Sequence, residues 1–439
     1  MITWSVNLNP NRMCPDLTVP RLEDAAGSAF RHLDELGAGA VRIDIFWHWL
    51  MPEPGQVNAE AVAWYQEFFA QADRRGVTLF PLLYHPPAWA MALLATDEPA
   101  FLAAWTDFCR LVRQAFGDAF PLVQVWNEPN NFLAALKQDP VLFFEKKIGP
   151  LNVPVGVRWE TLAALFAIAR AELAPGTLLV YNVLTNLSPF LPFKSAWLDW
   201  DVFTDRLLAI AGDHIDVIAL DHYPDTWAPG TGPLEWECLE VAAKKVNTPG
   251  TPWYGKTVII GEVGYSNAPN FHMVNGPVKL GRFFPDERCE DTQSRWYGAA
   301  MSHLRSRLTS EQFPHNRLQL VNVYELYDAP RPVGAHPVMA LEDHFGLRRR
   351  NGSPKPAFQV LQGVIGGTLS VDVAEWPAPV LPAYWKLARW GRDLHARLAG
   401  EPVATLAGEP LVLEAVVPAL AHGSEDTPAA SAAEGTTAR

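Results

Sequence analysis

The sequence has few cysteines, a deficit of basic residues and no long apolar run. Its four cysteines, Cys14, Cys109, Cys238 and Cys289, are scattered through 439 residues without a C-x-x-C pair. They therefore predict neither a zinc site nor a dense disulfide framework. The formal net charge of −13 leaves no basic stripe to neutralise phosphates, which argues against a nucleic-acid partner. No apolar run reaches the roughly 18–20 residues that span a bilayer, so no membrane partner is expected.

The N-terminus also lacks a recognisable export signal. The chain opens Met1-Ile-Thr-Trp-Ser-Val, without a basic segment followed by an apolar one. The expected location is cytoplasmic, and export by a removed or non-Sec signal stays open. What the sequence does contain is 49% hydrophobic residues, including 17 Trp, which is enough for a large core.

Apolar, β-branched segments alternate with helical patterns along most of the chain. This alternation predicts a parallel sheet with right-handed crossovers, in the α/β class. Eight such units predict a closed (β/α)8 barrel with long loops after the strands. A doubly wound sheet is the alternative, but no G-x-G-x-x-G follows the first expected strand. The expected strands cover residues 2–7, 40–46, 77–84, 121–126, 177–182, 215–220, 256–261 and 318–324.

The regular alternation fades after the eighth unit. We therefore assign residues 1–365 to the barrel and residues 366–419 to a short C-terminal extension that packs on it. Residues 420–439 are rich in Ala, Ser, Thr and Glu and poor in large apolar side chains. Such a composition is typical of a disordered tail.

Two glutamates stand at the ends of expected strands. Glu128 follows the apolar run that begins at Leu122, and Pro129 helps to end that strand because proline cannot donate to a sheet. Glu262 follows the run 256–261. Barrel enzymes place their catalytic groups at the carboxyl ends of the strands, and two carboxylates are the minimum for retaining glycoside hydrolysis. One attacks the anomeric carbon, and the other protonates the leaving oxygen.

These strand ends resemble those of a known group of enzymes. The segments Trp126-Asn-Glu-Pro129 and Ile260-Gly-Glu-Val-Gly264 are similar to the ends of the fourth and seventh strands in clan-A retaining glycoside hydrolases. Within this clan, the chain most resembles families 5 and 39. The strand count independently places the two glutamates on the fourth and seventh strands. The resemblance implies that Glu128 is the general acid/base, Glu262 the nucleophile, and Asn127 a ligand of the sugar 2-OH. It implies a carbohydrate substrate, and neither a metal nor another cofactor.

Further side chains are candidates for substrate binding or for orienting the pair. Arg42, on the second strand, needs a buried partner; this is either Glu262, whose pKa it would lower, or Asp44. The resemblance makes Tyr223 a hydrogen-bond donor to the nucleophile. It also places Asp221 where the clan often has histidine, which alters the expected sugar contacts.

For the remaining candidates the alternatives stay open. His85 can bind a sugar hydroxyl or a loop carbonyl. Trp47, Trp126 and Tyr324 can serve as sugar platforms or as packing; the eighth strand carries Tyr324 where many family 5 members have a stacking Trp.

The sequence thus predicts a retaining O-glycosyl hydrolase that cleaves β-glycosidic bonds by double displacement. A transglycosylase on the same scaffold and a non-catalytic carbohydrate-binding barrel are the alternatives. The mechanism predicts a bell-shaped pH dependence, with the acidic limb from Glu262 and the basic limb from Glu128.

Overall fold

The computed structural model describes eight ranges of the chain. They are residues 2–13, 22–131, 142–148, 151–185, 199–226, 232–268, 288–329 and 339–371. The chain divides into two units, Met1–Trp390 and Gly391–Arg439. The second unit lies outside the described residues, as do the expected tail and all but the first few residues of the expected extension.

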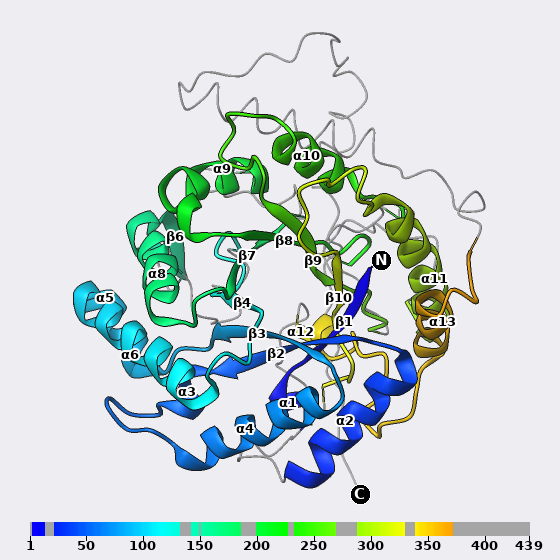
Figure 1. Ribbon diagram of the computed structural model, residues 1–439, viewed down its shortest axis with the longest axis horizontal. Helices are drawn as coiled ribbons and strands as arrows, with labels where there is room; N and C mark the ends of the chain where they lie inside the picture. The colour runs from blue at the N-terminus through cyan, green and yellow to red at the C-terminus, as the bar shows by residue number, and fades with distance from the viewer. Residues whose placement is uncertain are drawn as a thin grey trace, which may run out of the picture. The chain divides into compact units, whose positions relative to one another are not determined.

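Eight parallel strands form a closed barrel (Figure 1). Their spatial order is β1-β10-β9-β8-β7-β4-β3-β2, which confirms the predicted (β/α)8 architecture and excludes the doubly wound alternative. Each expected strand overlaps one observed strand. The strands are β1 (Thr3–Leu8), β2 (Ala40–Phe46), β3 (Thr78–Tyr84), β4 (Leu122–Val125), β7 (Leu178–Leu184), β8 (Val217–Asp221), β9 (Thr257–Val263) and β10 (Leu320–Val323).

Helices surround the barrel (Figure 1), and local capping fixes where several begin. The Asn58 side chain accepts hydrogen bonds from the first turn of α4, and Asp97 does the same for α6. The long helices are α2 (Leu22–Leu36), α4 (Ala59–Arg74), α6 (Glu98–Phe116), α8 (Trp159–Glu172), α9 (Trp200–Ala211), α10 (Glu237–Val246), α11 (Glu290–Arg307) and α13 (Pro356–Ile365). Shorter ones are α1 (Pro10–Met13), α3 (Trp47–Leu50), α5 (Ala88–Thr96), η2 (Gly212–His214) and α12 (Met339–Glu342). No helix of the described ranges is both long and apolar enough to cross a membrane.

The interior of the barrel changes from apolar to polar along the strands. Alternate residues of a barrel strand point inward, and the inward side chains near the strand starts form a separate apolar cluster that includes Ala40, Leu122 and Val180. Two residues further along the same strands stand Arg42, Gln124 and Asn182, all buried and polar. The apolar layer closes the amino end of the barrel, so the polar layer can bind a ligand only from the carboxyl end.

A hairpin that the sequence analysis did not predict follows β4. Strands β5 (Phe143–Ile148) and β6 (Leu151–Val157) pair antiparallel, with Phe143 opposite Val157. They lie between β4 and α8 in the chain, where the prediction had only a loop. The hairpin therefore belongs to the connection that follows Glu128 and leaves the barrel topology unchanged.

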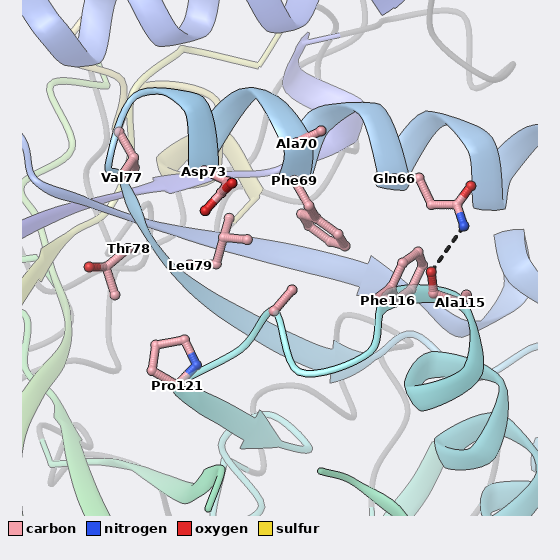
Figure 2. A pocket seen from close by; sticks show the side chains of 11 residues that line it. Gln66, Phe69, Ala70, Asp73, Val77, Thr78, Leu79, Ala115, Phe116 and Pro121 are labelled. Atoms are coloured by element: carbon pink, nitrogen blue, oxygen red, sulfur yellow. Dashed lines mark hydrogen bonds between the residues drawn. The ribbon is translucent and has the colours of Figure 1, made fainter.

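A surface pocket of about 410 Å³ lies near the amino ends of β3 and β4, away from the polar layer (Figure 2). Its lining includes Val77 and Thr78 at the start of β3 and Phe69 on α4. At one edge of it, Gln66 donates a hydrogen bond to the Ala115 carbonyl at 2.9 Å. None of the candidate site residues lines this pocket.

Candidate active site

The ends of β3 and β4 carry unusual backbone conformations. His85, Trp126 and Glu128 have positive φ angles of 56°, 65° and 37°, a region that residues other than glycine rarely adopt. Hydrogen bonds hold the turn after β4 in place: the Trp126 N–H donates to Leu83 O at 3.1 Å, and the Glu128 N–H donates to Asn182 Oδ1 at 2.8 Å. Strained residues of this kind collect at functional sites, where the surrounding structure enforces them.

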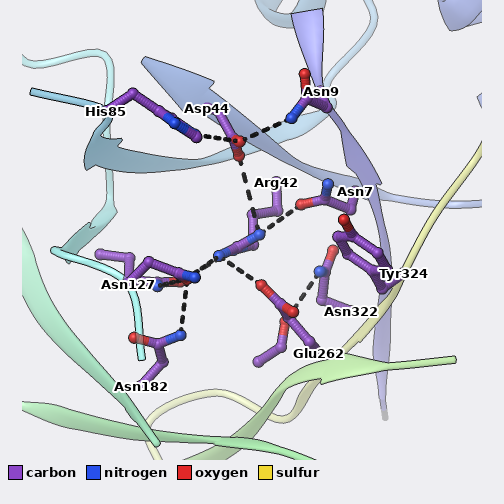
Figure 3. Close-up of polar contacts among 12 residues, drawn as sticks. Asn7, Asn9, Arg42, Asp44, His85, Asn127, Asn182, Glu262, Asn322 and Tyr324 are labelled. Atoms are coloured by element: carbon purple, nitrogen blue, oxygen red, sulfur yellow. Dashed lines mark hydrogen bonds and ion pairs between the residues drawn. The ribbon is translucent and has the colours of Figure 1, made fainter. Parts of the chain in front are cut away.

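Arg42 connects the second strand with the seventh. Its Nη2 lies 2.8 Å from Glu262 Oε1, whereas its Nη1 lies 3.9 Å from Asp44 Oδ1 (Figure 3). Of the two partners considered from the sequence, Glu262 is therefore the principal one. Burial raises the pKa of Glu262, and the Arg42 charge and the Tyr223 hydroxyl act in the opposite direction. The arginine does favour the carboxylate, as expected, but burial outweighs it, and the expected net lowering of the pKa is not found.

Asn127 is fixed through its carbonyl oxygen. Oδ1 accepts hydrogen bonds from Arg42 Nη2 at 3.2 Å, Gln124 Nε2 at 3.2 Å and Asn182 Nδ2 at 3.0 Å. Nδ2 makes no hydrogen bond within the described part of the chain. This arrangement orients the two N–H groups of the amide as donors for a ligand.

Glu128 is half-buried next to this group. Its Oε2 accepts a hydrogen bond from Asn131 Nδ2 at 2.5 Å. One carboxylate oxygen each from Glu128, Asp221 and Glu262 lies within 4.8 Å of the other two. An inverting glycosidase separates its two carboxyl groups by about 6.5–9.5 Å to admit a water molecule, and a retaining one by about 5–5.5 Å. The short approach of Glu128 to Glu262 fits the retaining geometry.

Tyr223 and Tyr324 lie on the other side of Glu262. The Tyr223 hydroxyl donates to Glu262 Oε2, as the resemblance implied, and burial beside Glu262 raises the pKa of this phenol well above its usual range. It is therefore a neutral donor. Tyr324 is partly exposed, and its hydroxyl donates to Glu342 Oε2 at 3.2 Å. Its ring meets the Tyr223 ring edge-on at 6.1 Å. Tyr324 therefore lies at the site, where its partly exposed ring can contact a sugar.

His85 bonds to a carboxylate instead of a loop carbonyl. Its Nε2 lies 3.1 Å from Asp44 Oδ2, which also accepts a hydrogen bond from Asn9 Nδ2 at 3.2 Å (Figure 3). The His85 side chain is 29% exposed and can still reach a ligand from the mouth of the barrel.

Trp47 and Trp126 belong to the core. Both rings are fully buried, and both pack against Trp105, at 5.5 and 6.3 Å between ring centroids. Trp47 also stacks on Phe108 at 5.1 Å. Of the two alternatives considered from the sequence, packing is the one observed, because neither indole presents a face to the opening.

Several site residues escaped the sequence analysis. Asn7, Gln124, Asn182 and Asn322 all hydrogen-bond within the polar layer. Gln124, Asn182 and Asn322 each interrupt a strand of otherwise apolar or aromatic residues, whereas the strand of Asn7 also contains Thr3 and Ser5. Strands of a parallel barrel are buried on both faces and read as apolar runs; an isolated amide inside one was the signal that could have found them.

A further buried acid, Glu325, lies near the site. Glu325 follows Tyr324, and burial raises its pKa to about 8. Arg12 Nη2 lies 3.3 Å from Glu325 Oε1. Neither was singled out from the sequence: Arg12 lies in the short helix α1, and Glu325 lies beyond the end of β10.

The three carboxylates of Glu128, Asp221 and Glu262 are the group whose spacing would admit a metal ion among the described residues. Arg42 already places a positive charge 2.8 Å from Glu262. A cation and this guanidinium would repel each other. The arrangement suits an acid/base and nucleophile pair better than a metal centre.

Comparison with known proteins gives a partial family match. The sequence model of Glycosyl hydrolase family 1 matches residues 28–137, about a quarter of the chain, which includes Arg42 and Glu128. No curated protein matches the sequence.

Solved structures match over most of the chain. GH5_18 from Streptomyces cattleya, in complex with GlcNAc, has a TM-score of 0.56 at 18% identity and covers 86% of this chain and 82% of its own. The family 1 β-glucosidase from Thermotoga maritima has a TM-score of 0.57 at 14% identity, with 84% and 98% covered. A family 39 glycoside hydrolase from Bacteroides cellulosilyticus has 0.52 at 16%, with 83% and 63% covered. Likeness at this identity establishes the shared barrel.

The findings support a clan-A retaining glycoside hydrolase. Three families of one clan share this fold with the chain, and the segment matched by the family 1 model ends just beyond the fourth strand and Glu128. An O-glycosyl hydrolase with a carbohydrate substrate is the corresponding activity. The cluster of acidic groups at the carboxyl ends of the strands fits the two glutamates that such an enzyme needs.

Proposed function

We propose that the protein cleaves β-glycosidic bonds by double displacement, with Glu262 as the nucleophile and Glu128 as the general acid/base. The observation that carries this proposal is the approach of their oxygens to within 4.8 Å at the ends of the fourth and seventh barrel strands. Asymmetry between the two supports the assignment of roles. Glu262 is held from two sides by Arg42 and Tyr223, which favours an ionised nucleophile, whereas half-buried Glu128 accepts a hydrogen bond from the neutral amide of Asn131.

The remaining groups have supporting roles. Asn127 offers its amide hydrogens to the sugar 2-OH. His85 and Tyr324 contact the sugar, and buried Asp221 lies beside Glu262 on the neighbouring strand. In the first step Glu262 attacks the anomeric carbon while Glu128 gives its proton to the leaving oxygen. In the second step Glu128 takes a proton from a water molecule, whose oxygen attacks the anomeric carbon and releases Glu262 as a carboxylate.

The names of the structural neighbours indicate which sugars to test first. One neighbour is in complex with Manβ1-4GlcNAc, one is an exo-β-1,4-mannosidase and another a β-glucosidase. We therefore begin with β-mannosides and β-glucosides.

The test is turnover of an aryl β-glycoside panel, with proton NMR of the anomer that appears first. Release of the β-anomer before mutarotation supports retention. Loss of at least about 10⁴-fold in kcat is expected for Glu262→Gln, as for removal of other nucleophiles. First release of the α-anomer would contradict the assignment.

The same assay separates the two alternatives. Products that carry an added acceptor alcohol in preference to water indicate a transglycosylase. Equal binding of oligosaccharide by the wild type and Glu262→Gln, without cleavage by either, indicates a binding barrel.

A further inference from the structure

Asp221 is a third carboxyl group inside the candidate site. It is the last residue of β8, pairs across the sheet with Glu262, and is fully buried. Its Oδ2 accepts a hydrogen bond from Asn182 Nδ2 at 2.6 Å. Its Oδ1 has no hydrogen-bond partner in the part of the chain that the structure describes.

The unpartnered oxygen faces β9. A Cβ atom built on Gly261 would lie 2.4 Å from Asp221 Oδ1, so this oxygen rests against the backbone directly before Glu262. The Asn182 amide occupies the opposite side, toward β7. Asp221 therefore presents Oδ1 toward the nucleophile strand.

The charge of the cluster is unbalanced if every carboxyl group is ionised. Glu128, Asp221 and Glu262 would carry three negative charges within 4.8 Å. Arg42 places one positive charge against the cluster, through its contact with Glu262. Like charges at this distance in a buried site are costly, and sites with paired carboxyl groups commonly retain a proton for this reason.

We propose that Asp221 is the neutral member of the cluster: Oδ1 carries a proton and offers it as a hydrogen-bond donor toward the Glu262 and Glu128 pair. This makes Asp221 a positioning residue, and its effect on catalysis rests on the proposed function. Protonated Asp221 thus adds a hydrogen-bond donor to the cluster where ionised Asp221 would add a third negative charge. Asp221 thereby orients the pair without competing for the Arg42 cation.

The surroundings of Asp221 favour the neutral form. Burial, then the charges of Glu262 and Glu128, raise the pKa of Asp221 well above its usual range, while Arg42 and the Asn182 amide act in the opposite direction. Two phenols interact with it electrostatically, Tyr181 on β7 and Tyr223. Burial raises the pKa of both, so neither supplies a positive charge or a proton near neutrality.

A neutral Asp221 keeps the site balanced through the first reaction step. At rest, ionised Glu262 and Arg42 cancel, and Glu128 and Asp221 are both protonated. When the Glu128 proton moves to the glycosidic oxygen and the C–O bond breaks, the new bond to Glu262 removes its charge. The pocket then again holds one anion, Glu128, and one cation.

The direct test is the protonation state of Asp221, measured without substrate. Protein with ¹³C-labelled aspartate is compared with its Asp221→Asn variant by infrared difference spectroscopy near neutral pH. We expect the variant to lose a protonated-carboxyl band. Asp73→Asn, at an exposed residue of α4, is the matched control and should leave that band intact. Loss of carboxylate intensity alone in Asp221→Asn would overturn the proposal.

The pH–rate profile tests the role in catalysis. Asparagine reproduces a neutral acid, since its oxygen can accept from Asn182 and its amide can donate toward Glu262. We expect Asp221→Asn to keep kcat/KM within about tenfold with both pH limbs in place, and Asp221→Ala to lose more without moving them. A shift of both limbs to lower pH by about one unit or more in Asp221→Asn would mean that a negative charge had been removed, which overturns the proposal. If the wild type cleaves no glycoside, the proposed function fails, while the infrared measurement still decides the state of Asp221.

Discussion

At the scale of single residues, Glu262 depends on two neighbours. Arg42 contacts one carboxylate oxygen at 2.8 Å and the Tyr223 hydroxyl contacts the other. Both oppose the effect of burial, which would otherwise keep the carboxyl group protonated. The pKa of Glu262 therefore depends on burial and on both neighbours, so a substitution of Arg42 or of Tyr223 should change it.

The raised pKa of Glu262 predicts the position of the acidic limb. The nucleophile must be ionised, so activity should fall as the pH decreases through a value above the ordinary 4.5 of glutamate. A kcat/KM profile measures this limb. An acidic limb below 4.5 would contradict the balance described here.

Arg42→Met should move this limb further. Loss of the cation leaves Glu262 buried without an ion partner, so its pKa rises and the limb shifts to higher pH. Removing one member of a buried ion pair also costs about 3–5 kcal/mol of stability, measurable by urea unfolding. Arg42→Lys is the control: it keeps the charge and should restore part of the limb position, though not the hydrogen bonds to Asn7 and Gln124.

Tyr223→Phe isolates the second neighbour. A hydrogen bond to a charged group contributes about 1.5–3 kcal/mol, so we expect kcat/KM to decrease roughly 10- to 150-fold, with the acidic limb at higher pH. The ring and its packing against Phe345 are retained, so the unfolding midpoint should change little. A large loss of stability without a change in the pH profile would assign Tyr223 a structural role.

At the scale of elements, β8 and β9 approach closely because Gly261 has no side chain. A Cβ atom there would lie 2.8 Å from Ala219 Cβ as well as 2.4 Å from Asp221 Oδ1. Real Cβ atoms do not tolerate such distances, so the two strands would have to move apart. The register that places Asp221 beside Glu262 therefore depends on this glycine.

Gly261→Ala should accordingly destabilise the protein by about 1–3 kcal/mol, the usual cost of overpacking, and reduce activity. Urea unfolding and aryl-glycoside turnover measure the two effects. Gly27→Ala is the matched control: a Cβ there meets nothing within 4 Å, and alanine in helix α2 should stabilise by roughly 0.5–1 kcal/mol. Equal effects of the two substitutions would exclude the proposed close contact.

Elements of regular periodicity were predictable from the sequence. The eight barrel strands and the strand-end positions of Glu128 and Glu262 follow from apolar runs that end at polar residues. The β5–β6 hairpin was not predicted, since a charged run, Glu145 to Lys147, interrupts β5 and Pro154 interrupts β6. The inward-facing amides of Asn182 and Asn322 were also missed: their function depends on partners that are distant in sequence, such as Asn127 and Gly261.

At the scale of the whole molecule, the barrel brings together groups that are far apart in the chain. Arg42, Asp221 and Glu262 lie on β2, β8 and β9, and Glu128 lies in the turn after β4. Closure of the sheet brings these groups together. The apolar layer that contains Ala40 and Leu122 closes the amino end of the barrel. This arrangement supports a site that admits substrate from one side and excludes water from beneath the reacting carbon.

Covalent trapping tests the account most directly. Intact protein is exposed to a panel of activated 2-deoxy-2-fluoro-β-glycosides, β-mannosides and β-glucosides first, and its mass is compared with that of Glu262→Ala under the same treatment. We expect one sugar adduct per chain, mapped by peptide sequencing to Glu262 and absent from the variant. An adduct on another residue, or turnover of the parent glycoside with inversion and no adduct, would contradict the assignment of Glu262 as the nucleophile of a retaining mechanism.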